Sequence, residues 1–288
     1  MSSGQKVILI SGCSSGIGYA TAIRLARAGH FVYASMRDIS GKNASSKKSL
    51  ESIFVSESLS GKVIEMDVSE DTSIHDAVNQ VLREKGSVDV LFNNAGFAII
   101  GAVEDFRRNE VLDQLQTDLY GPIELIRCVL PSMRSKKSGL IINMGSVAGR
   151  MGFPFTVPYV ISKFALEGLT ESLRPELKPF GISVTIIEAG VVKTRFYENM
   201  KRAKKSEISV YKDATSKTIE GGRHLFSQPD VTSPEDVAEK VFQAIKENGA
   251  RIRYVVGRDA ESLLDLMKSK KDEEFERYKM QDFTDVFK

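Results

Sequence analysis

The chain has 288 residues, of which 42% are hydrophobic and 27% are charged, and its formal net charge is +2 at pH 7. This composition supports a sizeable core and excludes global disorder. The small net charge gives no overall field for capturing nucleic acid, so we expect no nucleic-acid partner. The only cysteines, Cys13 and Cys128, exclude a dense disulfide scaffold, and neither has the spacing of a metal or redox motif, so we expect no metal site.

No targeting or membrane segment is evident in the sequence. The N-terminus, Met1 to Gln5, lacks the basic-then-apolar pattern of a signal peptide. No apolar run approaches the roughly 18 residues needed to cross a bilayer. We therefore expect a cytoplasmic protein in a reducing compartment, with no transmembrane segment.

In chain order, short apolar runs alternate with longer segments of helical period, which is the pattern of a parallel sheet with crossover helices. The first strand is expected at Val7–Ile10, and the helix from Ile17 ends at Gly29. Further strands are expected at 31–34, 62–66, 88–92, 140–143, 182–187 and 252–256, and long helices near 72–85, 111–133, 157–178 and 235–247. This alternation predicts an α/β protein with one domain over 1–288: a doubly wound Rossmann fold with about seven parallel strands and helices on both faces.

Three segments depart from the alternation. Residues 40–60 are rich in serine and lysine and are expected to hold a short helix. Residues 195–227 are basic and follow the sixth strand, where they form either a lid over the active site or a solvated basic helix. The tail, 260–288, is expected to be a surface helix with one docked face, the alternative being a role in partner or membrane binding.

A glycine-rich turn, Gly12-x-x-x-Gly16-x-Gly18, directly follows the first strand and runs into a helix. Glycine permits positive φ and a close approach of the backbone to a pyrophosphate, whose charge is bound by N–H groups at the helix start. The strand–turn–helix context makes this pattern typical of dinucleotide binding. The predicted phosphate-binding residues are Gly12, Ser14, Ser15, Gly16, Ile17 and Gly18.

The end of the second strand should select the cofactor, because an acidic residue there binds a ribose 2′-hydroxyl and a basic residue binds a 2′-phosphate. The sequence places Arg37 before Asp38. A guanidinium binds phosphate with two parallel hydrogen bonds. We therefore predict NADP(H) as the preferred cofactor, with NAD(H) as the alternative if Asp38 turns inward.

Two further groups follow predicted strands, at the sheet edge where ligands bind in open α/β proteins. Asp67 and Val68 follow the third strand, and the segment 93–96, Asn-Asn-Ala-Gly, follows the fourth. Asn93, Ala95 and Gly96 are predicted cofactor contacts, although turn formation alone also explains the asparagines.

Tyr159 and Lys163 are four residues apart in a helical segment and so share a face. A free phenol has a pKa of about 10, too high for a base near neutrality, and a nearby ammonium lowers it. Ser146 lies just past the fifth strand, 13 residues upstream of Tyr159, where its hydroxyl can bind a reacting oxygen. Alone, the spacing is common by chance; with Ser146 and the glycine turn it predicts an acid–base site.

With these motifs the chain resembles the short-chain dehydrogenase/reductase family over about residues 5–257, and most resembles its NADP(H)-preferring 17-beta-hydroxysteroid and retinol dehydrogenases. The resemblance implies that Tyr159 is the general acid of carbonyl reduction and the base of alcohol oxidation. It implies that Lys163 lowers the pKa of Tyr159 and holds the nicotinamide ribose, while Ser146 orients the substrate oxygen. It also implies cofactor contacts by Asp67, Asn93, Tyr159, Lys163, Gly190, Val192 and Thr194.

Two positions depart from the family pattern. The family has an asparagine that links the lysine to solvent through a water relay, and this chain has Asp118 there, which we include among the catalytic residues. A carboxylate near Lys163 is expected to pair with the lysine or raise its pKa. The family's Pro-Gly after the sixth strand is Ala189-Gly190 here, which is expected to loosen one turn.

We therefore expect an NADP(H)-dependent oxidoreductase that interconverts a carbonyl and an alcohol. Apolar residues suggest a steroid, retinoid, fatty-acyl or aromatic substrate, although core packing explains each as well: Phe97, Ile99, Ile100, Met151, Phe153, Phe155, Phe196 and Tyr197. A cofactor-binding sensor or scaffold without turnover is the alternative, and an epimerase or dehydratase is disfavoured because such chains carry a larger C-terminal domain. The family resemblance implies a homodimer or homotetramer.

Overall fold

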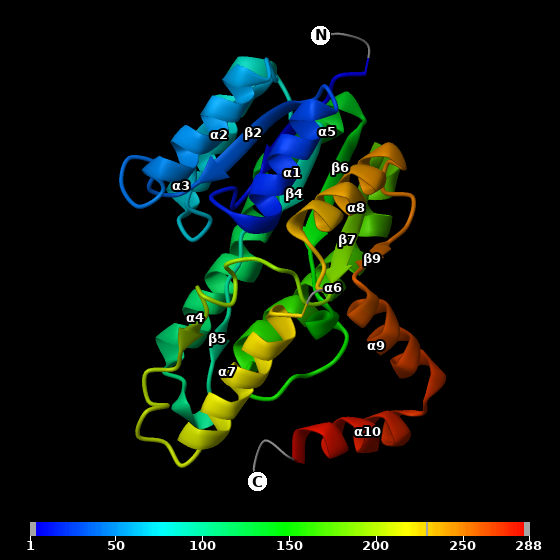
Figure 1. Cartoon of the computed structure of the whole chain (residues 1–288). Coiled ribbons are helices and arrows are strands. Elements are labelled where there is room, and N and C mark those ends of the chain that lie inside the picture. The colour runs from blue at the N-terminus through cyan, green and yellow to red at the C-terminus, as the bar shows by residue number, and fades with distance from the viewer. Residues whose placement is uncertain (1–3, 229, 285–288) are drawn as a thin grey trace.

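The computed structural model describes residues 4–228 and 230–284, so residues 285–288 of the predicted tail lie outside the described part. A parallel sheet of seven strands forms the centre, in the order β3-β2-β1-β4-β6-β7-β9 (Figure 1). The strands are β1 (Val7–Ile10), β2 (Phe31–Met36), β3 (Gly61–Glu65), β4 (Val90–Asn93), β6 (Gly139–Met144), β7 (Ile182–Ala189) and β9 (Arg253–Val256). The strand order reverses between β1 and β4, which opens a crevice at their carboxyl ends.

Helices cover both faces of the sheet, and the central strands β1, β4 and β6 are buried along their whole length. In β1, Ile8 and Ile10 pack in one apolar cluster, and Val7 and Leu9 pack in another on the opposite face. The first cluster includes residues of α1 (Gly16–Arg27), α2 (Ala44–Ser56) and α8 (Pro234–Lys246), and the second includes residues of α3 (Asp71–Lys85), α5 (Gly121–Lys136) and α6 (Val157–Leu177). The predicted doubly wound Rossmann fold is confirmed.

The predicted helix over 111–133 is wrong in one respect. The structure has α4 (Arg108–Leu115), a five-residue π turn η2 (Gln116–Tyr120), and then α5. The apolar period continues through the extra residue of the π turn, so the sequence pattern does not reveal it. Such turns are frequent at functional sites, and this one carries Asp118.

A second sheet of two short strands was not expected from the sequence. β5 (Ile99–Ile100) pairs in parallel with β8 (Lys201–Arg202), with Ile99 opposite Lys201. This pairing ties the segment after β7 to the segment after β4. The remaining helical elements are η1 (Val103–Asp105), η3 (Val147–Gly149), η4 (Lys178–Phe180), α7 (Lys212–Phe226), α9 (Arg258–Ser269) and α10 (Asp272–Thr284).

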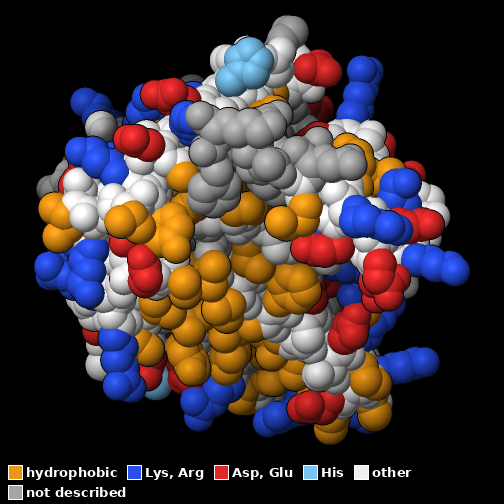
Figure 2. Space-filling view, turned by 90° about the horizontal axis from the view of Figure 1, so that it is seen from below, with side chains coloured by type: hydrophobic (Ala, Val, Ile, Leu, Met, Phe, Trp, Pro, Cys, Tyr) orange, Lys and Arg blue, Asp and Glu red, His pale blue; other side chains and the backbone are white. Residues whose placement is uncertain are grey.

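The C-terminal helices extend from the sheet toward the end of the molecule that carries α7 (Figure 1). Ala260 and Leu264 of α9 are buried against Val147 and Met151, which forms the docked face expected for the tail. Figure 2, the view from below, shows hydrophobic side chains gathered across this end of the molecule, with lysine and arginine side chains around them. Within residues 4–228 and 230–284, no helix has both the length and the apolar character of a membrane span.

Candidate active site

The glycine turn after β1 lies in direct backbone contact with the segment after β4. Gly12 has φ +74°, and a Cβ at this position would lie 2.8 Å from Cα of Ala95. A Cβ at Gly18 would collide with the Gly12 carbonyl oxygen and lie 2.5 Å from Nδ2 of Asn94. Any larger residue at Gly12 or Gly18 would therefore push the turn away from its partner segment.

Hydrogen bonds from Ser11 and Asn94 hold this contact together. Oγ of Ser11 accepts from the backbone N–H groups of Asn94 and Ala95, each at 3.0 Å. Nδ2 of Asn94 donates to the carbonyl oxygens of Ser11 at 2.9 Å and Gly12 at 3.1 Å. Neither Ser11 nor Asn94 was among the site residues predicted from the sequence. The pair of asparagines at the end of a predicted strand was the sequence feature that could have indicated the role of Asn94.

The start of α1 has the features of an anion site. Ser15 precedes its first turn without a capping hydrogen bond from its side chain, and that turn contains no acidic residue. The positive end of the helix dipole is thus not neutralised by the protein's own carboxylates. Gly16 has φ +60°, and a Cβ there would lie 3.1 Å from Cγ2 of Thr194. A side chain at Gly12 or Gly16 would fill the space between the turn, Ala95 and Thr194. The absence of side chains at these glycines leaves the backbone accessible, as the binding of a dinucleotide requires.

Arg37 and Asp38 point their side chains to different partners. Nη1 of the exposed Arg37 lies 3.6 Å from Oδ2 of Asp67. Asp38 has φ +49°, and its carboxylate accepts from the backbone N–H of Lys42 at 2.8 Å. Burial alone would raise the pKa of Asp67, but hydrogen bonds from Ser69 and the charge of Arg37 lower it below its ordinary value. A negative charge therefore stays beside Arg37.

The side chain of Asn93 faces the protein interior. Its Nδ2 donates to Oδ1 of Asn143 at 3.0 Å, and Nδ2 of Asn143 donates to Oγ1 of Thr170 on α6 at 2.9 Å. A cofactor contact by Asn93 would therefore use its backbone. Val68, the other predicted cofactor contact at this sheet edge, packs against α5: its carbonyl oxygen lies directly against Gly121 at the start of that helix.

The turn after β7 is fixed by Asp259, a residue that the sequence analysis missed. Oδ2 of Asp259 accepts from the backbone N–H of Val191 at 2.6 Å, and it lies where a Cβ on Gly190 would be. Val192 forms a parallel bridge with Thr232. The loosening expected from Ala189 is thus opposed by a carboxylate at the start of α9.

Tyr159 and Lys163 lie on α6, and Ser146 is the N-cap of η3 after β6. Nζ of the buried Lys163 donates to the Met144 carbonyl oxygen at 3.0 Å and lies 5.3 Å from the ring centre of Tyr159. Oγ of Ser146 accepts from the backbone N–H of Ala148 at 3.2 Å. The structure therefore brings together the three side chains of the predicted acid–base site.

Opposing effects set the pKa of Tyr159. Burial raises it, the charge of Lys163 and a hydrogen bond with Ser146 lower it, and the charge of Asp118 raises it again. The net direction is upward from the ordinary value of a phenol. At neutral pH Tyr159 therefore carries its proton, which is the form that can donate to a carbonyl oxygen.

Asp118 lies at the inner side of the π turn, fully buried beside Lys163. Its Oδ2 lies 3.5 Å from Nζ of Lys163, and its Oδ1 accepts from the backbone N–H of Phe97 at 3.2 Å. Burial raises the pKa of Asp118 to about 6, although Lys163 and the Phe97 hydrogen bond act in the opposite direction. The expected pairing of Asp118 with Lys163 is present in the structure.

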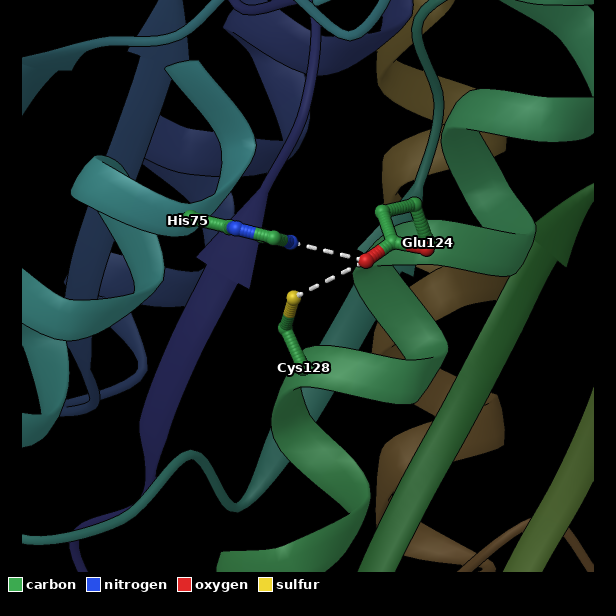
Figure 3. A group of neighbouring side chains, drawn as sticks. All are labelled: His75, Glu124 and Cys128. Carbon is green, nitrogen blue, oxygen red and sulfur yellow. Dashed lines mark hydrogen bonds and ion pairs between the residues drawn. The ribbon is translucent and has the colours of Figure 1, made fainter. Parts of the chain in front are cut away.

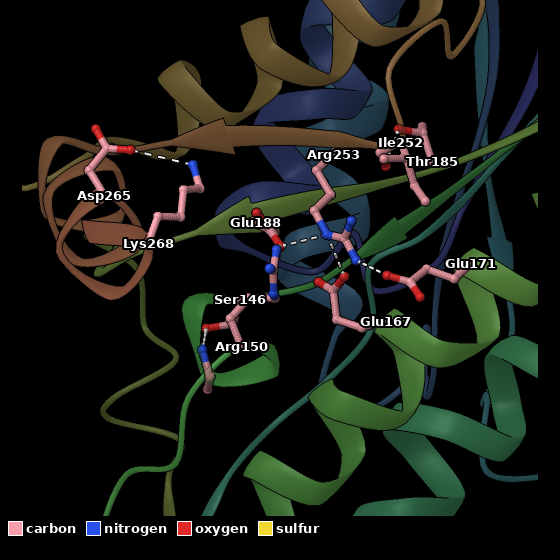
Figure 4. A network of polar contacts seen from close by, with 11 residues as sticks. Ser146, Arg150, Glu167, Glu171, Thr185, Glu188, Ile252, Arg253, Asp265 and Lys268 are labelled. Carbon is pink, nitrogen blue, oxygen red and sulfur yellow. Dashed lines mark hydrogen bonds and ion pairs between the residues drawn. The ribbon is translucent and has the colours of Figure 1, made fainter. Parts of the chain in front are cut away.

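A buried charge network supports the turn that carries Ser146 (Figure 4). Nη1 of Arg150 lies 2.9 Å from Oε1 of Glu188, and Nε of Arg253 lies 3.1 Å from the same oxygen. Nε of Arg253 also lies 2.9 Å from Oε2 of Glu167, which is one helical turn beyond Lys163. Burial and the charge of Glu188 raise the pKa of Glu167 to about 7, against the lowering effect of Arg253. No sequence motif indicated this network.

A cavity of about 720 Å³ lies between α7 and the segment after β7. Its lining combines apolar and charged side chains, among them Ile100, Lys193, Thr194, Tyr197, Ile219, Arg223 and Phe226. The structure divides the predicted apolar residues: Ile100 and Tyr197 line this cavity, Phe196 lies 5.7 Å from the Tyr159 ring, and Met151 and Phe153 pack against α9. The predicted lid thus forms one wall of a cavity that reaches Thr194.

Comparison with known proteins gives consistent matches. The family model described as short chain dehydrogenase matches residues 6–206. A 3-ketodihydrosphingosine reductase from Bacteroides thetaiotaomicron is 40% identical over 196 residues, which is 67% of this chain and 66%, just under two thirds, of that protein. The 17-beta-hydroxysteroid dehydrogenase type 1 of Mus musculus is 36% identical over 260 residues, covering 86% of this chain and 72% of that protein.

Solved structures match over most of the chain. A short-chain dehydrogenase from Streptomyces avermitilis superposes with a TM-score of 0.81 at 30% identity, covering 99% of this chain and 98% of that one. A metagenomic short-chain oxidoreductase in complex with NADP superposes with a TM-score of 0.68 at 25% identity, covering 88% of this chain and 96% of that one.

Proposed function

Because this chain belongs to the short-chain dehydrogenase/reductase family of oxidoreductases, we propose that it interconverts a carbonyl and an alcohol with NADP(H). The observation that carries the proposal is the convergence of Ser146, from the start of η3, with Tyr159 and Lys163, from α6. The bound nicotinamide would supply the hydride in reduction and accept it in oxidation.

In the proposed reaction, the protein handles the oxygen and its proton. Ser146 donates a hydrogen bond to the carbonyl oxygen and so orients it. Tyr159, protonated at neutral pH, transfers its phenolic proton to that oxygen as negative charge develops there. Lys163 stabilises the resulting phenolate, and the buried Asp118 balances the lysine's charge. In alcohol oxidation the phenolate takes the hydroxyl proton.

The preference for the 2′-phosphate form of the cofactor rests on the end of β2. The Asp38 carboxylate already accepts a hydrogen bond from the Lys42 backbone N–H, which turns it away from a role in binding a ribose hydroxyl. The Arg37 guanidinium is exposed. The phosphates would bind at Gly12, Gly16 and the start of α1. Asp67 stands beside Arg37, so a 2′-phosphate would compete with its carboxylate for the guanidinium.

An apolar substrate is favoured by the surroundings of Tyr159. The Phe196 ring packs near the phenol, and the cavity beyond Thr194 is walled partly by Ile100, Ile219 and Phe226. Two relatives are a 3-ketodihydrosphingosine reductase and a 17-beta-hydroxysteroid dehydrogenase, and sphingoid bases and steroids are largely apolar molecules. We propose a ketone or aldehyde of that class.

The test is a spectrophotometric screen that follows NADPH oxidation with steroid, retinoid, long-chain acyl and aromatic carbonyls. We expect turnover with at least one apolar carbonyl and a weaker response when NADH replaces NADPH. NADPH binding without turnover across the panel would favour the sensor or scaffold alternative, and equal use of NADH would contradict the cofactor preference.

A further inference from the structure

A group of metal-ligating side chains lies between α3 and α5, and the proposed reaction does not use it (Figure 3). Nε2 of His75 lies 2.8 Å from Oε1 of Glu124, and Sγ of Cys128 lies 3.8 Å from the same oxygen. All three donor atoms lie within 4.8 Å of one another. His75 comes from α3, and Glu124 and Cys128 come from α5, so the group bridges two helices.

The spacing of these residues explains why they converge. Glu124 and Cys128 are separated by four residues on α5, so their side chains lie one above the other on one face of the helix. On α3, Asp71 and His75 have the same separation and share a face. Two facing helices thus present two such pairs, one with a carboxylate and an imidazole and the other with a carboxylate and a thiol.

We propose that His75, Glu124 and Cys128 form a zinc site, with the fourth position taken by Asp71 or by water. Imidazole, carboxylate and thiolate are the three ligand types that Zn²⁺ uses in proteins, at about 2.0–2.3 Å from the metal. Donor atoms in a tetrahedral site are therefore ~3.3–3.7 Å apart. His75 is exposed, and Glu124 and Cys128 are partly buried, so the donor atoms are open to an ion from solvent. A site with thiolate and imidazole favours zinc over magnesium or calcium.

A neighbouring contact orients one of the proposed ligands. Nη1 of Arg127 lies 2.6 Å from Oε2 of Glu124, which leaves Oε1 toward His75 and Cys128. On zinc binding, the S–H bond of Cys128 breaks, sulfur keeps the electron pair for the metal, and the proton goes to solvent.

This site was not expected from the sequence, because neither cysteine has a metal-motif spacing. The four candidate ligands are two separated pairs, 49 residues apart from His75 to Glu124, and only the packing of α3 against α5 brings them together. The inference is independent of the proposed reaction, and it can fail without affecting that proposal.

The experiment titrates the chelator-treated, tag-free full chain with ZnCl₂ in competition with a chromogenic zinc chelator. We expect one equivalent of zinc per chain. In His75→Ala and in Cys128→Ser the zinc affinity should fall roughly tenfold or more. Loss of a group that only supports a ligand typically costs that much, and loss of a ligand should cost at least as much. His224→Ala is the matched control, because His224 is an exposed histidine on α7 and should leave the affinity unchanged.

A second measurement uses the parent chain and needs no variant. Cys13 is fully buried and Cys128 is partly exposed, so a thiol reagent should modify one cysteine in the native protein. Zn²⁺ should slow that modification in the parent and in His224→Ala, and much less in His75→Ala. Absence of a bound equivalent, equal affinity in all the variants, or no protection of Cys128 would each overturn the zinc site.

Discussion

The glycine turn and the proposed lid, residues 195–227, are linked through Thr194, which lies against Gly16 and lines the cavity, and they are built differently. In the turn, backbone meets backbone: Gly12 lies against Ala95, and Ser11 and Asn94 join the two segments by hydrogen bonds. Residues 195–227 have one backbone pairing, between β8 and β5, and otherwise many contacts between side chains, such as the Tyr197 and Phe226 rings at 4.7 Å. The comparison indicates that the glycine turn tolerates almost no added atom, whereas we expect the proposed lid to accept changes of side chain.

The same difference explains what the sequence could predict. Backbone contacts need glycine at fixed spacing, so Gly12, Gly16 and Gly18 were recognisable, and the alternation of strands and helices gave the sheet. The π turn at Asp118 was not recognisable, because the apolar period runs through it. Neither was the role of Asp259, which fixes a turn 68 residues earlier in the chain and belongs to no local pattern.

Polar contacts between residues far apart in the chain are the part of the structure that the sequence does not predict. The Arg253 guanidinium joins Glu167 and Glu188 only because β7, β9 and α6 pack side by side. In the sequence each of these residues looks like an ordinary surface charge. Their burial becomes visible only when the packed structure is known.

The largest effect among the variants of the turn and the lid is expected for Gly12→Ala. The substitution combines a positive φ, which costs about 1–2 kcal/mol for alanine, with a collision against Ala95. We expect NADPH binding to weaken on the order of 100-fold, as strain of about 1–3 kcal/mol at the binding turn implies. Fluorescence titration with NADPH measures this.

Gly86→Ala is the matched control for the turn. Gly86 has φ +79°, close to that of Gly12, but no atom lies within 4 Å of the Cβ position. It should lose about 1 kcal/mol of unfolding free energy and bind NADPH normally. Equal NADPH affinities in the two variants would break the claim that close approach, and not φ alone, requires glycine at Gly12.

Arg37→Ala tests the cofactor preference at the edge of the same crevice. Loss of hydrogen bonds to a charged group of about 1.5–3 kcal/mol should weaken NADPH binding roughly 10- to 100-fold. NADH binding should change little, because NADH has no 2′-phosphate. A parallel loss of affinity for both cofactors would contradict the assignment of Arg37 to the phosphate.

Phe226→Ala tests the lid. Removal of a partly buried ring from the cavity wall should raise the KM of an apolar carbonyl by roughly tenfold, in line with about 25 cal/mol per Å² of lost apolar contact. The dissociation constant of NADPH should be unaffected. If Phe226→Ala loses NADPH affinity and keeps the parent's KM for the carbonyl, the assignment of this region to the substrate would be contradicted.

Asp118→Asn should give the smallest effect, a shift in the pH profile. The negative charge of Asp118 raises the pKa of Tyr159, so neutralising it lowers that pKa. Alcohol oxidation needs the phenolate, and its kcat/KM should therefore rise at lower pH in the variant than in the parent. A profile that moves to higher pH, or does not move, would show that the two groups are not coupled as the structure indicates.

Asp118→Asn should also change how the free energy of unfolding depends on pH. The pKa of Asp118 is raised to about 6 in the folded chain, so the folded state binds this proton more tightly than the unfolded state. Its contribution to stability is present below the unfolded pKa, near 4, and is lost as pH rises through about 6. Urea unfolding at pH 5 and pH 7 should show a smaller loss in Asp118→Asn than in the parent.

The central claim is that the Tyr159 hydroxyl transfers the proton, and that the predicted cofactor contact of Tyr159 contributes little to NADPH affinity. Tyr159→Phe removes only the phenolic oxygen and keeps the ring that packs near Phe196. With the carbonyl found in the screen, we expect kcat to fall by about 10²- to 10⁴-fold while the dissociation constant of NADPH stays close to that of the parent. Undiminished turnover in Tyr159→Phe would contradict the account.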